Sequence, residues 1–119
     1  ALLGRALTHL RLVADGRIAL ATISKRDFEE TGAEEVYTEG IVNELLAINT
    51  VQIAALIREP RSGKIKASIR SRGEIDVATA ARQFNGGGHL NAAGCTFDTD
   101  LDRAESSLEE ALTRCLAFS

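Results

Sequence analysis

The sequence is poor in aromatic side chains and carries no excess of positive charge. Aromatic residues make up 4% of its 119 residues, with one Tyr and no Trp, so we do not expect an aromatic surface that stacks nucleic-acid bases. A formal net charge of -3 argues against a broad basic face of the kind that holds a nucleic-acid backbone. Any site for an anion must therefore be local.

Cysteines and long apolar runs are scarce as well. Cys95 and Cys115 are too few and too far apart for a disulfide framework or a clustered zinc site, so we expect two core-packing thiols. The longest apolar run, Ile18 to Ile23, is too short to cross a membrane, and no signal segment opens the chain. We predict a cytoplasmic protein with no membrane partner. The chain starts with Ala1 instead of Met, as a fragment of a longer protein does.

What the sequence does contain is typical of one globular domain: 45% hydrophobic and 26% charged residues. The hydrophobic periodicity predicts helices over 1–12, 39–48, 76–84 and 101–115, and strands over 17–24, 51–58, 64–70 and 93–98. A loop with one helical turn is expected over 25–39. This alternation predicts an α/β fold, a small mixed β-sheet with helices packed against it, in a single domain.

The segment from Lys64 to Arg70 alternates with the two-residue period of a strand. Its apolar residues are Ile65, Ala67 and Ile69, and its polar residues are Lys64, Lys66, Ser68 and Arg70. One face of this strand therefore faces the core, and the opposite face is cationic.

The glycine run Gly86, Gly87 and Gly88 is the most informative motif. Without side chains, its backbone N–H groups can approach a ligand oxygen closely and form an anion nest. His89 follows the run and can donate a hydrogen bond to phosphate, and Arg70 can add a charge-assisted contact. Together these residues predict a phosphate pocket.

The residues after the histidine suit the rest of a nucleotide. A helical turn over 90–93 would direct its free N–H groups at the same anion. Asn91 can bind a ribose hydroxyl or a base edge, and Ala92 and Ala93 are small enough to let a ligand lie close. A second interpretation is open on these residues alone, because a triple glycine is also common in flexible loops and Arg70 can be a solvated strand-end charge.

The run GGGHLNAAG, preceded by a strand ending SIRSRGEIDV and a helix ATAARQF, closely resembles the DHH-associated C-terminal domain of DHH phosphoesterases. The segments ETGA at 30–33 and TEGIVN at 38–43 resemble the oligoribonuclease and adenosine-bisphosphate phosphatase branch, often called NrnA. The resemblance covers most of the chain. GGGH is its most specific motif.

This resemblance implies that the chain is one domain of a two-domain enzyme. In the family, an N-terminal domain with an Asp-His-His motif binds two manganese ions, and the C-terminal domain holds the nucleotide across the cleft. Residues 1–12 would then be the remnant of a linker helix, and residues 13–119 the substrate-binding domain. By matching position, the phosphate would be held by Gly86, Gly87, Gly88 and His89, assisted by Arg70, with Asn91, Ala92 and Ala93 lining the nucleotide site.

The chain departs from the family in lacking the Asp-His-His motif, and its two histidines, His9 and His89, are far apart. We therefore predict no catalytic residue and no metal ligand in this chain, with manganese held by the missing N-terminal domain. The expected partners are that domain and a nucleotide or short RNA substrate, and a homodimer of the full-length protein is compatible with the resemblance. Alone, the chain should bind nucleotides weakly and hydrolyse none.

Three alternatives share the glycine-rich stretch. One is the RNA-binding and association module at the C-terminus of alanyl-tRNA synthetases, against which the acidic balance argues. The others are the equivalent domains of RecJ-like exonucleases and of cyclic-dinucleotide phosphodiesterases.

Overall fold

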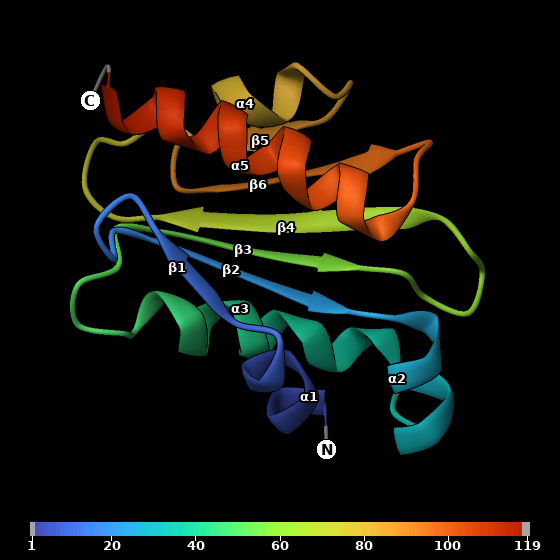
Figure 1. Cartoon of the computed structure of the whole chain (residues 1–119). Helices are drawn as coiled ribbons and strands as arrows, with labels where there is room; N and C mark the ends of the chain where they lie inside the picture. Colours follow the sequence, from blue (N-terminus) through green and yellow to red (C-terminus); the bar gives the residue numbers. More distant parts are fainter. Residues whose placement is uncertain (1, 118–119) are drawn as a thin grey trace.

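A single six-stranded sheet with helices on both faces forms the protein (Figure 1). The computed structural model describes residues 2–117. The strand order is β1-β2-β3-β4-β6-β5. Strands β2 and β3 are parallel, and all other neighbouring strands are antiparallel. The predicted α/β class, with a small mixed sheet and helices packed against it in one domain, is confirmed.

The elements follow one another in this order: α1 Leu2–Thr8, β1 Arg11–Val13, β2 Ile18–Ile23, α2 Lys25–Thr31, the 3-10 helix η1 Glu35–Tyr37, α3 Thr38–Leu46, β3 Ile53–Arg58, β4 Ile65–Ser71, α4 Ala78–Arg82, β5 Gly87–His89, β6 Ala92–Phe97 and α5 Leu101–Ala117.

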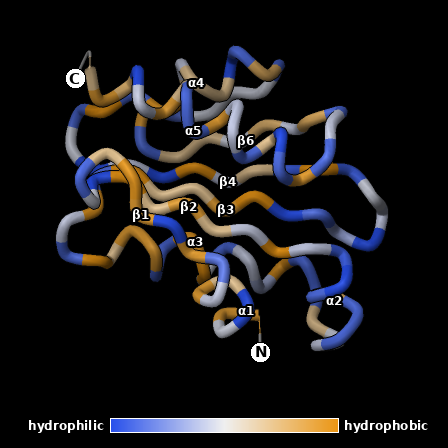
Figure 2. Tube along the Cα trace, in the orientation of Figure 1, coloured by the Kyte–Doolittle hydropathy of each residue, from blue (hydrophilic) through white to orange (hydrophobic). Residues whose placement is uncertain are grey.

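The two faces of the sheet carry two separate apolar clusters. Alternate residues of β3 divide between them: Ile53, Ala55 and Ile57 lie in the cluster with α4 and α5, whereas Ala54 and Leu56 lie in the cluster with α1, α2 and α3. Figure 1 shows these two sets of helices on opposite sides of the sheet. Both faces of β2 and β3 are covered by helices, as the continuous apolar sequences of these strands require. Figure 2 shows apolar residues concentrated in these central strands.

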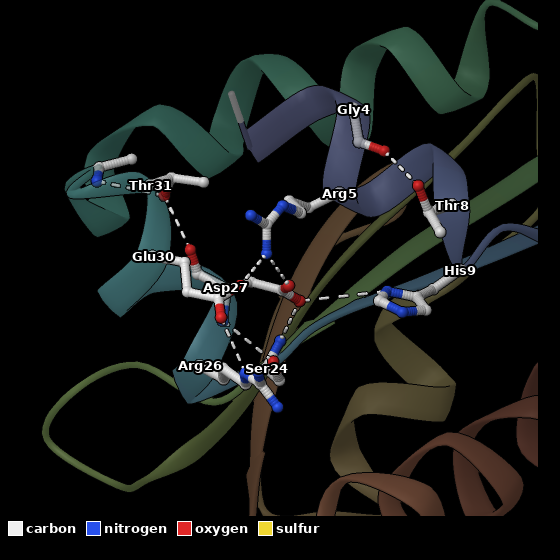
Figure 3. Close-up of polar contacts among 10 residues, drawn as sticks. Gly4, Arg5, Thr8, His9, Ser24, Arg26, Asp27, Glu30 and Thr31 are labelled. Atoms are coloured by element: carbon white, nitrogen blue, oxygen red, sulfur yellow. Dashed lines mark hydrogen bonds and ion pairs between the residues drawn. The ribbon is translucent and has the colours of Figure 1, made fainter.

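A polar cluster joins α1 to α2 (Figure 3). The Ser24 side chain accepts a hydrogen bond from the Asp27 N–H, and the Asp27 carboxylate accepts one from the Ser24 N–H, which together form a capping box. Arg5 donates to both Asp27 and Glu30, at 3.1 and 2.6 Å. The prediction of a loop with a single helical turn over 25–39 is therefore wrong, because these caps stabilise a seven-residue helix followed by η1.

The N-terminal helix is shorter than the 1–12 predicted. It ends at Thr8, and Arg11–Val13 form the edge strand β1, with Arg11 opposite Leu20 of β2. The leucine spacing favoured a longer helix, but pairing with β2 overrides it. Leu2 and Ala6 are buried against the sheet. The assignment of 1–12 to a linker and of 13–119 to the substrate-binding domain stays a prediction, and residues 1, 118 and 119 lie outside the described residues.

Helix α4, Ala78–Arg82, is shorter than the predicted 76–84. The Asp76 side chain accepts a hydrogen bond from the Ala78 N–H at 3.0 Å just before this helix. The Asp100 side chain accepts one from the Arg103 N–H at 2.8 Å at the start of α5. Both cysteines are free thiols. Within residues 2–117, no helix is long and apolar enough to span a membrane.

Candidate functional site

A groove of about 490 Å³ lies on the sheet face that carries α3, over strands β4 and β6 and the start of β5. Here β4 alternates between buried and partly exposed residues, as the sequence predicts, so its polar side chains line the groove. The charged and polar lining residues are Glu39, Arg58, Lys66, Ser68, Arg70, Asn85 and Thr96.

The strand register aligns the predicted site residues across the sheet. Arg70 of β4 is paired with Ala92 of β6, and Ala92 is paired with His89 of β5. Paired residues share a sheet face, so Arg70 and His89 lie on the groove side with Ala92 between them, with their Cα atoms about 10 Å apart. The row therefore places two potential hydrogen-bond donors on either side of a methyl group.

A second row lies beside the first and has almost no side chains. Ser68 is paired with Gly94, and Gly94 is paired with Gly87. Because the three residues lie on the groove side, the backbone itself forms the floor here. A ligand group between Arg70 and His89 could contact this floor directly.

Arg70 is held in a defined orientation. Its Nη1 donates to the Ile69 carbonyl at 2.9 Å, and its Nη2 donates to both carboxylate oxygens of Glu39, at 2.8 and 2.6 Å. Its side chain is 18% exposed. The guanidinium is therefore mostly buried yet reaches the groove, where it can bind an anion.

Two further cations lie in the groove. Arg58 Nε is 2.9 Å from Glu35 Oε2 and its Nη1 is 2.9 Å from Ser68 Oγ, while Lys66 Nζ is 3.4 Å from the same Glu35 oxygen. Burial alone would raise the pKa of Glu35, but the hydrogen bond from Arg58 and the charges of Arg58 and Lys66 outweigh burial and lower it. Glu35 is therefore a carboxylate at neutral pH.

The glycine run is a strand and not the predicted anion nest. Gly87 to His89 form β5 and pair with β6, and the Gly86 N–H donates to the Ala81 carbonyl at 2.9 Å. The predicted helical turn over 90–93 is also wrong, because Leu90 and Asn91 form the turn of a hairpin and β6 starts at Ala92. The nest prediction overlooked that glycine also permits two strands to approach closely.

The three glycines have different surroundings. A Cβ on Gly86 would lie 2.1 Å from the Gly94 carbonyl oxygen, and one on Gly88 would lie 2.5 Å from the Ala92 carbonyl oxygen. A Cβ on Gly87 would have no heavy atom within 4 Å apart from those of its two chain neighbours, and the φ angle of Gly87 is not positive. Packing within the chain thus explains Gly86 and Gly88, whereas Gly87 leaves open space in the groove.

The remaining predicted residues occupy different positions. His89 is exposed, next to the groove on its row, and not among its lining residues. The Asn91 amide nitrogen donates to Ser71 Oγ at 2.9 Å and to the Gly73 carbonyl at 3.0 Å, which fixes the hairpin turn. Ala92 contributes to the floor, whereas the Ala93 side chain is buried in the apolar cluster on the other face.

The sequence did not single out several residues that line the groove or contact its cations. Glu35 and Glu39 come from the start of η1 and α3, and Arg58 from the end of β3, so only the folded chain brings them next to β4. For Lys66, the one signal in the sequence was the cationic face predicted for the strand over 64–70. Arg72 does not join the site, because it donates to the Val51 and Leu46 carbonyls.

The described residues offer no metal centre. Within residues 2–117, no three His, Cys, Asp or Glu side chains gather in a way that could hold a metal ion. His9 lies by the α1–α2 cluster, with Nδ1 4.0 Å from Asp27 Oδ2 (Figure 3). The His, Cys, Asp and Glu side chains of residues 2–117 therefore do not fit a two-manganese site.

Comparison with known proteins supports the resemblance noted in the sequence. A family model described as the DHHA1 domain matches residues 15–117. The chain is 31% identical over 112 residues to a Thermus thermophilus protein named bifunctional oligoribonuclease and PAP phosphatase NrnA, covering 93% of this chain and 33% of the relative. A Geobacillus thermodenitrificans protein named cyclic-di-AMP phosphodiesterase GdpP is 32% identical over 91 residues, 76% of this chain and 14% of the relative.

A solved structure agrees with these matches. An exopolyphosphatase-related protein from Bacteroides fragilis superposes with a TM-score of 0.86 at 33% identity, covering 95% of this chain and 33% of that one. The chain thus spans about a third of the length of the Thermus relative and of this structure. The predicted family is confirmed, and the chain belongs to the DHHA1 domain family, the C-terminal domain of DHH phosphoesterases.

Proposed function

We propose that this chain is the substrate-binding domain of a phosphoesterase that hydrolyses short oligoribonucleotides, adenosine bisphosphate or both. The observation that carries the proposal is the row Arg70–Ala92–His89 beside the open space above Gly87. A cation, a hydrogen-bond donor and an uncovered backbone floor are the chemistry that a phosphate group requires. The names of the Thermus and Geobacillus relatives, an oligoribonuclease and phosphatase and a phosphodiesterase, support the same class of reaction.

Each residue has a defined task in this proposal. Arg70 binds the phosphate oxygens by charge-assisted hydrogen bonds, and His89 donates from the opposite end of the row. Gly87 allows the phosphate to approach the backbone. Asn91 shapes the hairpin turn that presents His89, because both hydrogen bonds donated by its side-chain amide nitrogen go to the chain itself.

The bond-breaking chemistry belongs elsewhere in the enzyme. We propose that a DHH domain preceding this chain holds manganese, which would supply an activated water molecule and charge neutralisation at phosphorus. This chain binds and orients the ester, a contribution that depends on geometry and not on a catalytic group. The cytoplasmic location, the short-RNA substrate and the homodimer stay predictions.

Calorimetric titration tests the proposal. The chain is titrated with the dinucleotide pApA and with adenosine 3′,5′-bisphosphate, and each mixture is incubated with Mn²⁺ and checked for products. We expect weak saturable binding without hydrolysis, and manganese-dependent hydrolysis by a longer protein in which a DHH domain precedes the same chain. Absence of binding to both nucleotides contradicts the proposal.

Cyclic dinucleotides are a second candidate substrate. The chain is 32% identical to the protein named GdpP over 91 residues, which are 76% of this chain. A cyclic dinucleotide has two diesters and no terminal phosphate. Tighter binding of cyclic di-AMP than of pApA would favour this candidate.

A further inference from the structure

Every cation that lines the groove already has a carboxylate partner. Glu35 contacts both Arg58 and Lys66, at 2.9 and 3.4 Å, and Glu39 contacts Arg70 at 2.6 Å. Both carboxylates come from the segment Glu35–Glu39, which spans η1 and the start of α3. This segment therefore sets the charge of the groove.

The two carboxylates differ in how firmly they are held. The Glu35 side chain is 33% exposed and shared between two cations, one of which, Arg58, is only 14% exposed. The Glu39 side chain is 63% exposed, and both of its hydrogen bonds go to a single nitrogen, Nη2 of Arg70. Glu35 is thus a fixed countercharge, whereas Glu39 can leave at little cost and stands where an anionic ligand would meet Arg70.

The charge count indicates the ligand. The groove has three cations, Arg58, Lys66 and Arg70, against Glu35 and Glu39. When a ligand displaces Glu39, two positive charges remain uncompensated, and one phosphate monoester dianion neutralises them. A polyphosphate chain would bring several further charges close to Glu35.

Building on the phosphate site proposed above, we propose that Glu35 and Glu39 are specificity-determining residues that restrict the groove to a single phosphate group and disfavour a polyphosphate chain. Removing the two carboxylates should therefore improve binding of a triphosphate more than binding of a monophosphate.

Affinities of the chain for AMP and ATP at pH 8 in metal-free buffer test this inference, because the two ligands share the same adenosine. We expect the wild type to bind AMP more tightly than ATP. Glu35→Gln with Glu39→Gln should shift the ratio of the two dissociation constants towards ATP by about tenfold or more, and Glu39→Gln alone by about threefold. Glu44→Gln removes one charge from an exposed position of the same helix and should leave the ratio unchanged.

The outcomes separate this inference from the proposed function. Binding of both nucleotides with the same ratio in the wild type and the variants overturns the role of the carboxylates and leaves the phosphate site intact. A wild type that binds ATP more tightly than AMP also overturns the role of the carboxylates. Binding of neither nucleotide overturns both proposals. Circular dichroism checks the fold of the double variant, and the exposed single variant Glu39→Gln decides the question if the double variant does not fold.

Discussion

Gly87 and Gly88 are adjacent on β5, yet a side chain at one would enter open space and at the other would collide with β6. A Cβ on Gly88 would lie 2.5 Å from the Ala92 carbonyl oxygen, and the φ angle of Gly88 is 141°. A Cβ on Gly87 would meet no heavy atom within 4 Å apart from those of its two chain neighbours. Of these two positions, chain packing therefore demands glycine only at position 88. The absence of a side chain at position 87 calls for an explanation outside the chain, and a bound ligand provides one.

The two glycines make a matched pair of variants. We expect Gly87→Ala to change the free energy of unfolding by less than about 0.5 kcal/mol and to weaken AMP binding, because the added methyl group fills the floor of the groove. Gly88→Ala should lower the free energy of unfolding by about 1–3 kcal/mol through backbone strain. Urea denaturation and calorimetric titration measure both quantities. Unchanged AMP affinity in Gly87→Ala would place the ligand elsewhere.

The two histidines make a second matched pair. His89→Ala should weaken AMP binding about tenfold, because it removes the hydrogen-bond donor at one end of the Arg70–His89 row. This is the loss of affinity expected for one charge-assisted hydrogen bond. His9→Ala changes a residue of the α1–α2 cluster and should leave the affinity unaltered. Titration calorimetry measures both variants. Equal affinities in the two variants would remove His89 from the site.

Asp27 should make the stability of the fold sensitive to acid. Burial raises its pKa, but hydrogen bonds from the Ser24 backbone, Arg5 and the Ser24 hydroxyl outweigh burial and hold the pKa below the usual 3.8. A lowered pKa in the folded state means that the ionised carboxylate stabilises the fold above about pH 4, and that this contribution is lost as the pH falls through the folded value.

Asp27→Asn tests this dependence. At pH 7 the variant should lose about 1–2 kcal/mol of unfolding free energy, and the difference from the wild type should shrink between pH 4 and pH 2. Urea unfolding at a series of pH values gives the curve. Glu29→Gln, an exposed change in the same helix, serves as the control. A difference that stays constant with pH would contradict the assigned role.

Cys95 should be inert to thiol reagents while the protein is folded. Burial raises the pKa of its thiol to about 11, so little thiolate exists at pH 8. In a Cys115→Ser background, we expect a thiol-specific dye to label Cys95 at the rate of unfolding and to label it rapidly in urea. Fast labelling of the folded protein would show that this region of β6 opens locally.

Local sequence signals predicted much of the fold. The two-residue alternation of Lys64 to Arg70 acts over a few residues, and the structure shows the same alternation of burial along β4. The errors fall where distant partners decide. Arg11–Val13 became a strand because β2 lies beside them, and Gly87–His89 became a strand because β6 does.

The helix α2 could have been predicted, because Ser24 and Asp27 have the spacing of a capping box. The set of charged side chains around the groove could not have been predicted in this way. Glu35 is 23 residues before Arg58 in the sequence, and it meets Arg58 and Lys66 only through the pairing of β3 with β4 and the position of η1. The sequence alone named Arg70, Gly87 and His89 of the proposed site, and only the strand register shows that Arg70 and His89 lie on one row.

Amide chemical shifts during an AMP titration of the ¹⁵N-labelled chain test the phosphate site most directly. We predict saturable shifts concentrated at Arg70, Gly86, Gly87, His89, Ala92 and Gly94, and their loss in Gly87→Ala. Shifts that are absent, or that gather at Thr79, Gln83 and Arg114 in the separate 300 Å³ pocket between α4 and α5, would contradict it.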